Sequence, residues 1–260
     1  VRWHPEPLPD DEGPLRHNQE WMDERRQEAE LDNCGFHRVE RLPGNVGYID
    51  IRRFHRAEWG GDTAAAAMNF LANANALIID LRQCWGGYPG MVALVSSYLF
   101  GEEPLHLGSI YWRDDDSIQQ TWTLPHVPGK RLSVVPVYVL TSKETFSGGE
   151  AFAYHLQAHG RATLVGEKTD GGAHPGASYR VHPHFEAFIP IGRAINPMTG
   201  EDWEGRGVVP DVSVPPEQAL NVAYRMALES VIGSIGEPAS GPLSLLLKEA
   251  QAALKDTEKG

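Results

Sequence analysis

The segment TFSGGE, residues 145–150, has the residue types of a nucleophile turn, because an apolar run ends there and an amphipathic helix begins. Serine is a common helix N-cap, so a purely structural role for Ser147 is the alternative to a catalytic one. Gly148 and Gly149 favour catalysis, because they leave the serine hydroxyl unshielded. The positive end of the helix dipole would also stabilise an oxyanion that develops at this point.

A second glycine turn lies in DLRQCWGGYPG, residues 80–90. Gly86 and Gly87 follow an apolar run and precede a helical segment. A plain loop with turn glycines is the structural alternative. In the functional interpretation, the N–H groups of these two glycines join that of Gly148 to form an oxyanion hole.

Four other polar residues accompany these turns. We expect Asp80 and Arg82, at a strand end, to form a structural ion pair. Cys84 has no histidine beside it in sequence that would lower its pKa, so a small, partly buried side chain is expected rather than a thiolate. Glu204, in a loop, is either an inert surface acid or a residue that orients a base or binds a substrate amine.

The elements that must position these residues form an α/β pattern. Residues 76–82, 133–141 and 162–166 are apolar runs of strand length, each followed by a glycine loop, and the first two then lead into helices. Such runs indicate a mostly parallel sheet flanked by helices, and ligands bind such sheets at the carboxyl ends of the strands. We also expect strands at 36–42 and 46–54, helices at 15–31, 62–74 and 216–231, and a hairpin from 177–182 and 185–195.

Composition limits the classes of function. The 260 residues are sufficient for one large domain, and the net charge of −12 disfavours nucleic acid or an anionic membrane as the main partner. No apolar run reaches the length of a membrane span, and two cysteines cannot form a disulfide framework. No metal or cofactor motif is present, so none is expected. The chain begins at Val1 without a signal-peptide pattern, so we expect a fragment or processed product whose compartment the sequence does not assign.

Four motifs resemble peptidase family S41, which includes tail-specific or C-terminal processing proteases, the tricorn core and the repeats of interphotoreceptor retinoid-binding protein. The resemblance spans residues 46–215, and the motifs are DLRQCWGGYPGMVALVSSYLF, TSKETFSGGEAFAY, LVGEKTDGGAHPG and WEGRGVVPDVSV. It implies a ClpP- or crotonase-like β-β-α core, no cofactor, and hydrolysis of peptide or protein substrates. It also implies that Ser147 is the nucleophile, and Glu204 matches a glutamate of the histidine-using branch.

The general base is less defined by this resemblance. In the processing proteases the base is a lysine, but Gly172 takes its place here and Lys168 lies nearby. The tricorn-like branch uses a histidine from the N-terminal part, which would be His4 or a residue upstream of Val1. His174 is a further candidate within the chain, and Lys168 would require desolvation to lower its pKa.

The sequence divides into three expected regions. Residues 1–44 are a connector and surface helix, residues 45–235 the catalytic core, and residues 236–260 a helical tail. The first region is too short for the PDZ domain of processing proteases, so a PDZ groove is not expected. Two other functions stay open: a non-catalytic binder of a lipophilic ligand, and an ester or acyl hydrolase or transferase that acts on a small molecule. Homo-oligomerisation is also open.

Overall fold

The computed structural model describes residues 1–8, 13, 19–236 and 239–257 of the chain. The helices are α1 (Gln19–Leu31), α2 (Ala57–Phe70), α3 (Pro89–Ser97), α4 (Gly148–Ala158), α5 (Pro216–Ile235) and α6 (Pro242–Thr257). The main sheet contains β2 (Phe36–Leu42), β3 (Val46–Ile51), β4 (Ala76–Asp80), β7 (Val137–Thr141), β8 (Thr163–Gly166) and β12 (Val212–Ser213). The other strands are β1 (Arg2–Trp3), β5 (His106–Trp112), β6 (Ser117–Trp122), β9 (Gly176–His182), β10 (Phe185–Pro190) and β11 (Gly192–Ile195).

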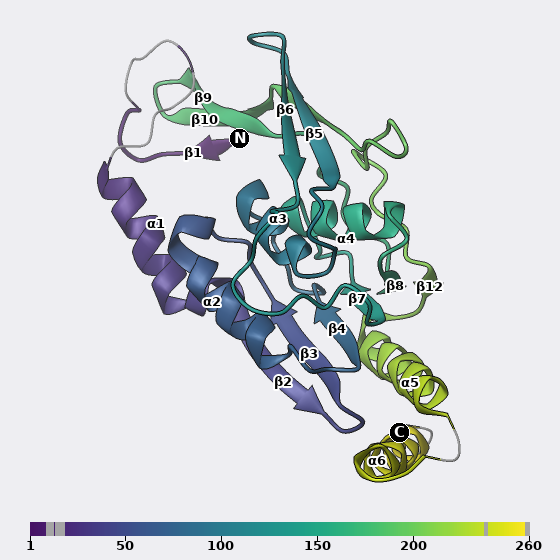
Figure 1. Ribbon diagram of the computed structural model, residues 1–260. Coiled ribbons are helices and arrows are strands. Elements are labelled where there is room, and N and C mark those ends of the chain that lie inside the picture. Colours follow the sequence, from purple (N-terminus) through teal and green to yellow (C-terminus); the bar gives the residue numbers. More distant parts are fainter. Residues whose placement is uncertain (9–12, 14–18, 237–238, 258–260) are drawn as a thin grey trace.

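The main sheet has the strand order β12-β8-β7-β4-β3-β2 (Figure 1). Within this sheet, neighbouring strands pair in parallel, except that β2 is antiparallel to β3. Helices follow β3, β4 and β7, as crossovers between parallel strands require. The predicted mostly parallel sheet flanked by helices is therefore confirmed.

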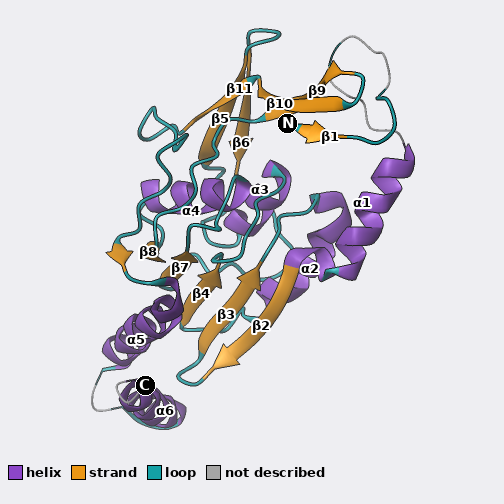
Figure 2. Ribbon diagram, turned by 180° about the vertical axis from the view of Figure 1, so that it is seen from behind, coloured by secondary structure: helices purple, strands orange, loops and turns teal. Residues whose placement is uncertain are grey.

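The sheet is buried on both faces. One face, including Ile49 and Ile79, packs against α2, α3 and α4, whereas the other, including Tyr48 and Ile78, packs against α5 (Figure 2). All residues of β4 and β7 are buried, because successive side chains of a strand point to opposite faces and both faces are covered. This two-sided burial explains why the sequence of these strands is continuously apolar rather than alternating.

Helix α1 lies against α2 at the edge of the molecule (Figure 1). The sequence predicted a helix over 15–31; the described part begins at Gln19, and residues 15–18 lie outside the described residues. The helix ends at Leu31, as predicted, and Asn33–Gly35 form a separate 3-10 turn after it.

Two small sheets lie at the end of the molecule opposite α6 (Figures 1 and 2). Strands β9 and β10 form the predicted hairpin, and β1 pairs with β10. The second predicted arm was too long, because residues 192–195 leave the hairpin and pair with β5 as β11. Strands β5 and β6 were not predicted; β6 is largely exposed, so its sequence lacks the apolar run that identified the central strands.

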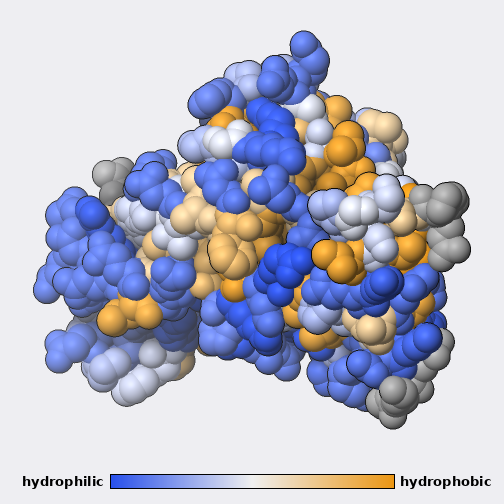
Figure 3. Space-filling view, turned by 60° about the horizontal axis from the view of Figure 1, so that its bottom comes forward, coloured by the Kyte–Doolittle hydropathy of each residue, from blue (hydrophilic) through white to orange (hydrophobic). Residues whose placement is uncertain are grey.

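Hydrophilic residues cover most of the face shown in Figure 3, with hydrophobic residues in smaller areas between them. Among the helices that the structure describes, none combines the length and the apolar composition that crossing a membrane would need.

A partly buried arginine fastens the segment between α3 and β7. Arg161 donates hydrogen bonds to the carbonyl oxygens of Leu99 (2.5 Å), Leu132 (2.6 Å) and Val135 (2.9 Å). Burial lowers the pKa of this guanidinium, and its three carbonyl partners compensate for lost hydration. Arg161 thus helps to close a segment of more than thirty residues that carries β5 and β6, together with the backbone bond from the Leu132 N–H to the Tyr98 carbonyl.

We expect Arg161→Met to lower the free energy of unfolding by about 3 kcal/mol, because three carbonyls lose a donor at about 1 kcal/mol each. Urea denaturation measures this loss. The matched control is Arg225→Met, because Arg225 is half exposed and only 3.9 Å from Glu229, so its removal should change stability by less than about 0.5 kcal/mol. Equal effects of the two substitutions would contradict the role given to Arg161.

Candidate active site

Ser147 lies in a strained turn between β7 and α4. Its backbone has φ 51° and ψ −114°, a conformation that residues with a Cβ atom rarely adopt. The turn is fixed on both sides: Phe146 donates its N–H to the carbonyl of Cys84 at 2.9 Å, and Ser147 donates its N–H to Glu150 Oε2 at 2.8 Å. The half-buried serine is thereby held at the N-terminus of α4, and it lines a cavity.

Glu150 connects this turn to the following loop. Its carboxylate is fully buried, and in addition to the Ser147 N–H it accepts bonds from the Thr169 hydroxyl (2.6 Å) and from the N–H groups of Gly171 (2.7 Å) and Gly172 (2.9 Å). Four donors satisfy both oxygens, so the buried charge is compensated by hydrogen bonds rather than by an ion pair. The loop after β8 is consequently fixed relative to the serine.

The second glycine turn packs directly on the serine turn. Gly87 has φ +138°, and a Cβ atom there would lie 2.0 Å from the carbonyl oxygen of Phe54. A Cβ atom on Gly148 would lie 2.8 Å from the nitrogen of Gly87. Both positions therefore require glycine, and the absence of side chains brings two backbone segments into contact beside Ser147.

The three predicted oxyanion donors do not lie in equivalent places. Gly87 and Gly148 line the same cavity as Ser147, whereas Gly86 is not among the described residues of its wall. The N–H of Gly86 instead bonds to the Cys84 thiol. Burial raises the pKa of that thiol to about 12, against the opposing effect of the Gly86 bond. Cys84 is therefore a neutral thiol, as expected from the sequence, although it is fully rather than partly buried. The geometry favours two donors, Gly87 and Gly148.

The cavity beside Ser147 has a volume of about 160 Å³. Its wall is mostly apolar, and its polar side chains other than Ser147 include His155 and His174. The apolar part is formed by Pro89, Val92, Ile110, Ala151, Pro175, Ala194, Ile195 and Trp203. The volume resembles that of an apolar cavity that admits benzene, so the site could accept a side chain of that size.

His174 is the histidine candidate that shares the cavity with Ser147. Its Nε2 lies 3.1 Å from Asp202 Oδ2, and its Nδ1 lies 3.9 Å from Glu204 Oε2. Because the carboxylate of Asp202 only accepts, the neutral ring carries its proton on Nε2 and leaves Nδ1 as the basic nitrogen. Glu204 Oε2 also accepts the N–H groups of Ala173 (2.7 Å) and His174 (2.9 Å), which fixes the backbone under the imidazole.

The sequence analysis selected Glu204 but missed Asp202. Asp202 stands only two residues earlier, in the same loop, and its Oδ1 accepts the N–H of Glu204 at 3.0 Å. The signal that could have identified it is the DxE spacing, because Asp202 contacts the His174 ring and Glu204 its backbone.

The other two base candidates lie elsewhere. Lys168 is exposed and does not line the cavity. His4 belongs to the small sheet: its N–H bonds to the carbonyl of His184 at 2.8 Å, and its Nε2 lies 3.3 Å from Glu186. Neither residue is therefore placed to serve Ser147 within the part of the chain that the structure describes.

His155 is a cavity residue that the sequence analysis did not select. It is buried on α4, which Ser147 precedes, and burial lowers its pKa to about 3, so the ring is neutral. Its Nδ1 has no hydrogen-bond partner among the described residues. The four-residue spacing of Ser147, Ala151 and His155 places them on one helix face, and this periodicity could have indicated a shared cavity.

We expect Glu150→Gln to lower the free energy of unfolding by about 3 kcal/mol. The NH2 group that replaces one carboxylate oxygen cannot accept hydrogen bonds, so the two donors at that oxygen lose a charged acceptor. Urea denaturation measures the loss. Glu144→Gln is the matched control in the same turn, since its exposed carboxylate has no hydrogen-bond partner among the described residues. If both variants were equally stable, the connecting role of Glu150 would be wrong.

The chain is similar to known proteases in sequence. The carboxyl-terminal-processing protease of Picosynechococcus sp. is 26% identical over 186 residues, which cover 68% of this chain and 41% of the relative. The chloroplastic carboxyl-terminal-processing peptidase 1 of Arabidopsis thaliana is 27% identical over 179 residues, which cover 67% of this chain and 35% of the relative. The chain thus matches less than half of the length of each relative.

Solved structures show the same fold. The photosystem II D1 C-terminal processing protease has a TM-score of 0.54 at 23% identity, over 66% of this chain and 43% of that chain. A lipoprotein from Streptococcus agalactiae has a TM-score of 0.57 at 15% identity, over 78% of this chain and 74% of that chain. The family model of peptidase family S41 matches residues 45–214, which include Ser147, both glycine turns and Glu204. The chain therefore belongs to peptidase family S41.

Proposed function

We propose that the protein is a serine peptidase in which Ser147 attacks the carbonyl of a peptide bond and forms an acyl-enzyme. One observation carries the proposal: Ser147, the two backbone turns at Gly87 and Gly148, and His174 line a single cavity. These are a nucleophile, oxyanion donors and a base, the groups that acyl transfer needs.

In the proposed mechanism, His174 Nδ1 removes the proton of the Ser147 hydroxyl as the new C–O bond forms. Asp202, which accepts from Nε2, stabilises the resulting imidazolium. The N–H groups of Gly87 and Gly148 stabilise the oxyanion, assisted by the dipole of α4. The imidazolium then gives its proton to the leaving amine, and water, activated by the same histidine, releases the acyl group.

Glu204 and Glu150 act as positioning residues in this mechanism. Glu204 holds the backbone of the loop at His174. Glu150 holds the preceding residue pair of that loop, Gly171 and Gly172, against the serine turn. The proton path from serine to histidine therefore depends on two carboxylates that need not contact the substrate. Fixed geometry of this kind lowers the barrier because the reacting groups need no reorganisation.

The cavity indicates the class of substrate. Its apolar wall favours a peptide or protein with an apolar side chain next to the cleaved bond. Because the relatives are named carboxyl-terminal-processing proteases, we propose cleavage near the C-terminus of such a substrate. Recognition through this cavity does not require a PDZ groove. A volume of about 160 Å³ is below that of typical ligand pockets. This size disfavours the alternative function, a non-catalytic binder of a lipophilic ligand.

The nucleophile is tested by labelling with a fluorophosphonate, which forms a covalent bond with activated serines. We expect the wild-type protein to be labelled and Ser147→Ala to be unlabelled, since no other hydroxyl of the described residues lies in a glycine turn at a helix N-terminus that lines this cavity. The far-ultraviolet circular dichroism of the variant should be unchanged, which serves as the folding control. Equal labelling of both proteins would reject Ser147 as the nucleophile.

The base is tested by three matched variants. His174→Ala should lower kcat for an apolar peptide substrate by about 10²–10⁴-fold, the usual contribution of general base catalysis. Lys168→Ala and His4→Ala should leave kcat unchanged, because neither side chain lines the cavity. If Lys168→Ala or His4→Ala lost activity while His174→Ala stayed active, His174 would be rejected as the base in favour of that residue. The role proposed for Ser147 would be unaffected.

A further inference from the structure

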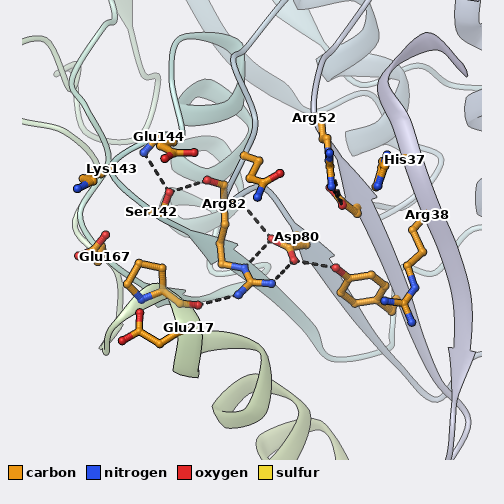
Figure 4. Close-up of a pocket in the computed structure, with 14 residues that line it drawn as sticks. His37, Arg38, Arg52, Asp80, Arg82, Ser142, Lys143, Glu144, Glu167 and Glu217 are labelled. Carbon is orange, nitrogen blue, oxygen red and sulfur yellow. Dashed lines mark hydrogen bonds and ion pairs between the residues drawn. The ribbon is translucent and has the colours of Figure 1, made fainter. Parts of the chain in front are cut away.

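A second cavity, of about 520 Å³, lies at the carboxyl ends of β3, β4, β7 and β8 (Figure 4). It is on the α5 side of the sheet, because Asp80 and Tyr48 in its wall share the face that packs against α5. None of its lining residues also lines the cavity of Ser147. Strand ends of parallel sheets are the usual place for ligands, and the catalytic mechanism leaves this cavity unused.

The centre of the cavity is a closed network of hydrogen bonds. Arg82 donates to both oxygens of Asp80 at 2.9 and 2.6 Å, and Tyr48 donates to Asp80 Oδ2 at 2.7 Å. A third nitrogen of Arg82 donates to the carbonyl of Pro216 at 2.7 Å, which fixes the start of α5. These groups satisfy one another, so they form a rigid floor rather than free binding groups; the predicted pairing of Asp80 with Arg82 is confirmed.

Carboxylates gather at the β8 and α5 end of the cavity (Figure 4). Glu144, Glu167 and Glu217 lie there, and none has an ion pair with a described residue, although Lys143 is near. Glu167 Oε2 is buried without any hydrogen-bond partner among the described residues. A buried carboxylate oxygen without a donor is costly, and the broad two-fold torsion of a glutamate carboxylate allows either oxygen to turn toward the cavity. Among the described residues, no cation is paired with these three carboxylates, although Lys143 lines the same end of the cavity.

Basic side chains gather at the opposite end, on β2 and just beyond β3 (Figure 4). His37 has no ion-pair partner among the described residues. Arg52 uses Nε and Nη2 on one oxygen of Asp50, at 3.3 and 3.2 Å, so its Nη1 is uncommitted in that pair. Arg38 lines the cavity but pairs with Glu40, which is not among its lining residues. This end can therefore donate hydrogen bonds to an anion.

We propose that this cavity binds a small zwitterion, a free amino acid or a short peptide with both termini free. The ammonium group would pair with Glu167 and Glu217, and the carboxylate would accept bonds from His37 and Arg52. A ligand of a single charge would leave one end uncompensated, whereas a molecule with separated opposite charges complements both ends. The volume is large enough for either a free amino acid or a short peptide, and the experiment below distinguishes these two ligands.

Isothermal titration of the Ser147→Ala protein, which cannot turn over a peptide, tests the proposal at constant ionic strength. The probes are glycine, triglycine, N-acetyl-triglycine and triglycinamide. We expect saturable binding of a free zwitterion, weakened about tenfold when either terminus is capped, because each cap removes a charged hydrogen bond. Binding of glycine would identify an amino acid site, and binding of triglycine alone a peptide site.

Two variants then locate the binding. Glu167→Gln should lower the affinity for the free zwitterion about tenfold. This variant should then bind the free and the N-acetylated probes with similar affinity. Glu102→Gln is the control, since Glu102 is exposed and does not line the cavity. No saturable binding of glycine or triglycine, equal affinity for capped and free probes, or equal effects of the two substitutions would overturn the proposal. Because the assay needs no catalysis, its failure is separate from any failure of the proposed peptidase activity.

Discussion

The arrangement of the active site depends on one buried carboxylate, that of Glu150. Its two oxygens accept from the serine turn on one side and from residues 169–172 on the other. Without it, the strained backbone at Ser147 would have no partner for its N–H, and the loop that carries His174 would lose its hydrogen bonds to the carboxylate that also holds the serine turn. A buried charge is normally unfavourable, so its presence here reflects the need to hold several backbone donors at fixed positions.

The same sheet edge serves two different environments. On the α4 side, two glycine turns in contact produce a small, mostly apolar cavity. On the α5 side, the residues that lead into those turns, Arg82 and Ser142, line a larger charged cavity. Ser142 donates to the carbonyl of Arg82 at 2.6 Å, so the two loops are joined before they diverge. A ligand on the charged side would therefore contact the segments that position the proposed oxyanion donors.

The sequence predicted the parts of the structure that depend on burial and local chemistry. Continuous apolar runs identified β4 and β7, and glycines after strands identified both turns of the site. It did not predict β5 and β6, which owe their place to pairing and to Arg161 rather than to an apolar pattern. Asp202 and His155 were also missed, since their contacts with the cavity arise only when loops distant in sequence fold together. The choice among His174, Lys168 and His4 likewise needed three-dimensional placement.

The backbone conformation of Ser147 has an evolutionary implication. Glycine adopts a positive φ without steric penalty, so a chain with glycine at this position would relax the turn and fold more stably. Selection for stability alone would thus eliminate the hydroxyl. If Ser147 is the nucleophile proposed above, its backbone strain is a stability cost accepted for reactivity, since glycine would satisfy the fold alone. A descendant that lost its chemistry would be free to drift toward glycine.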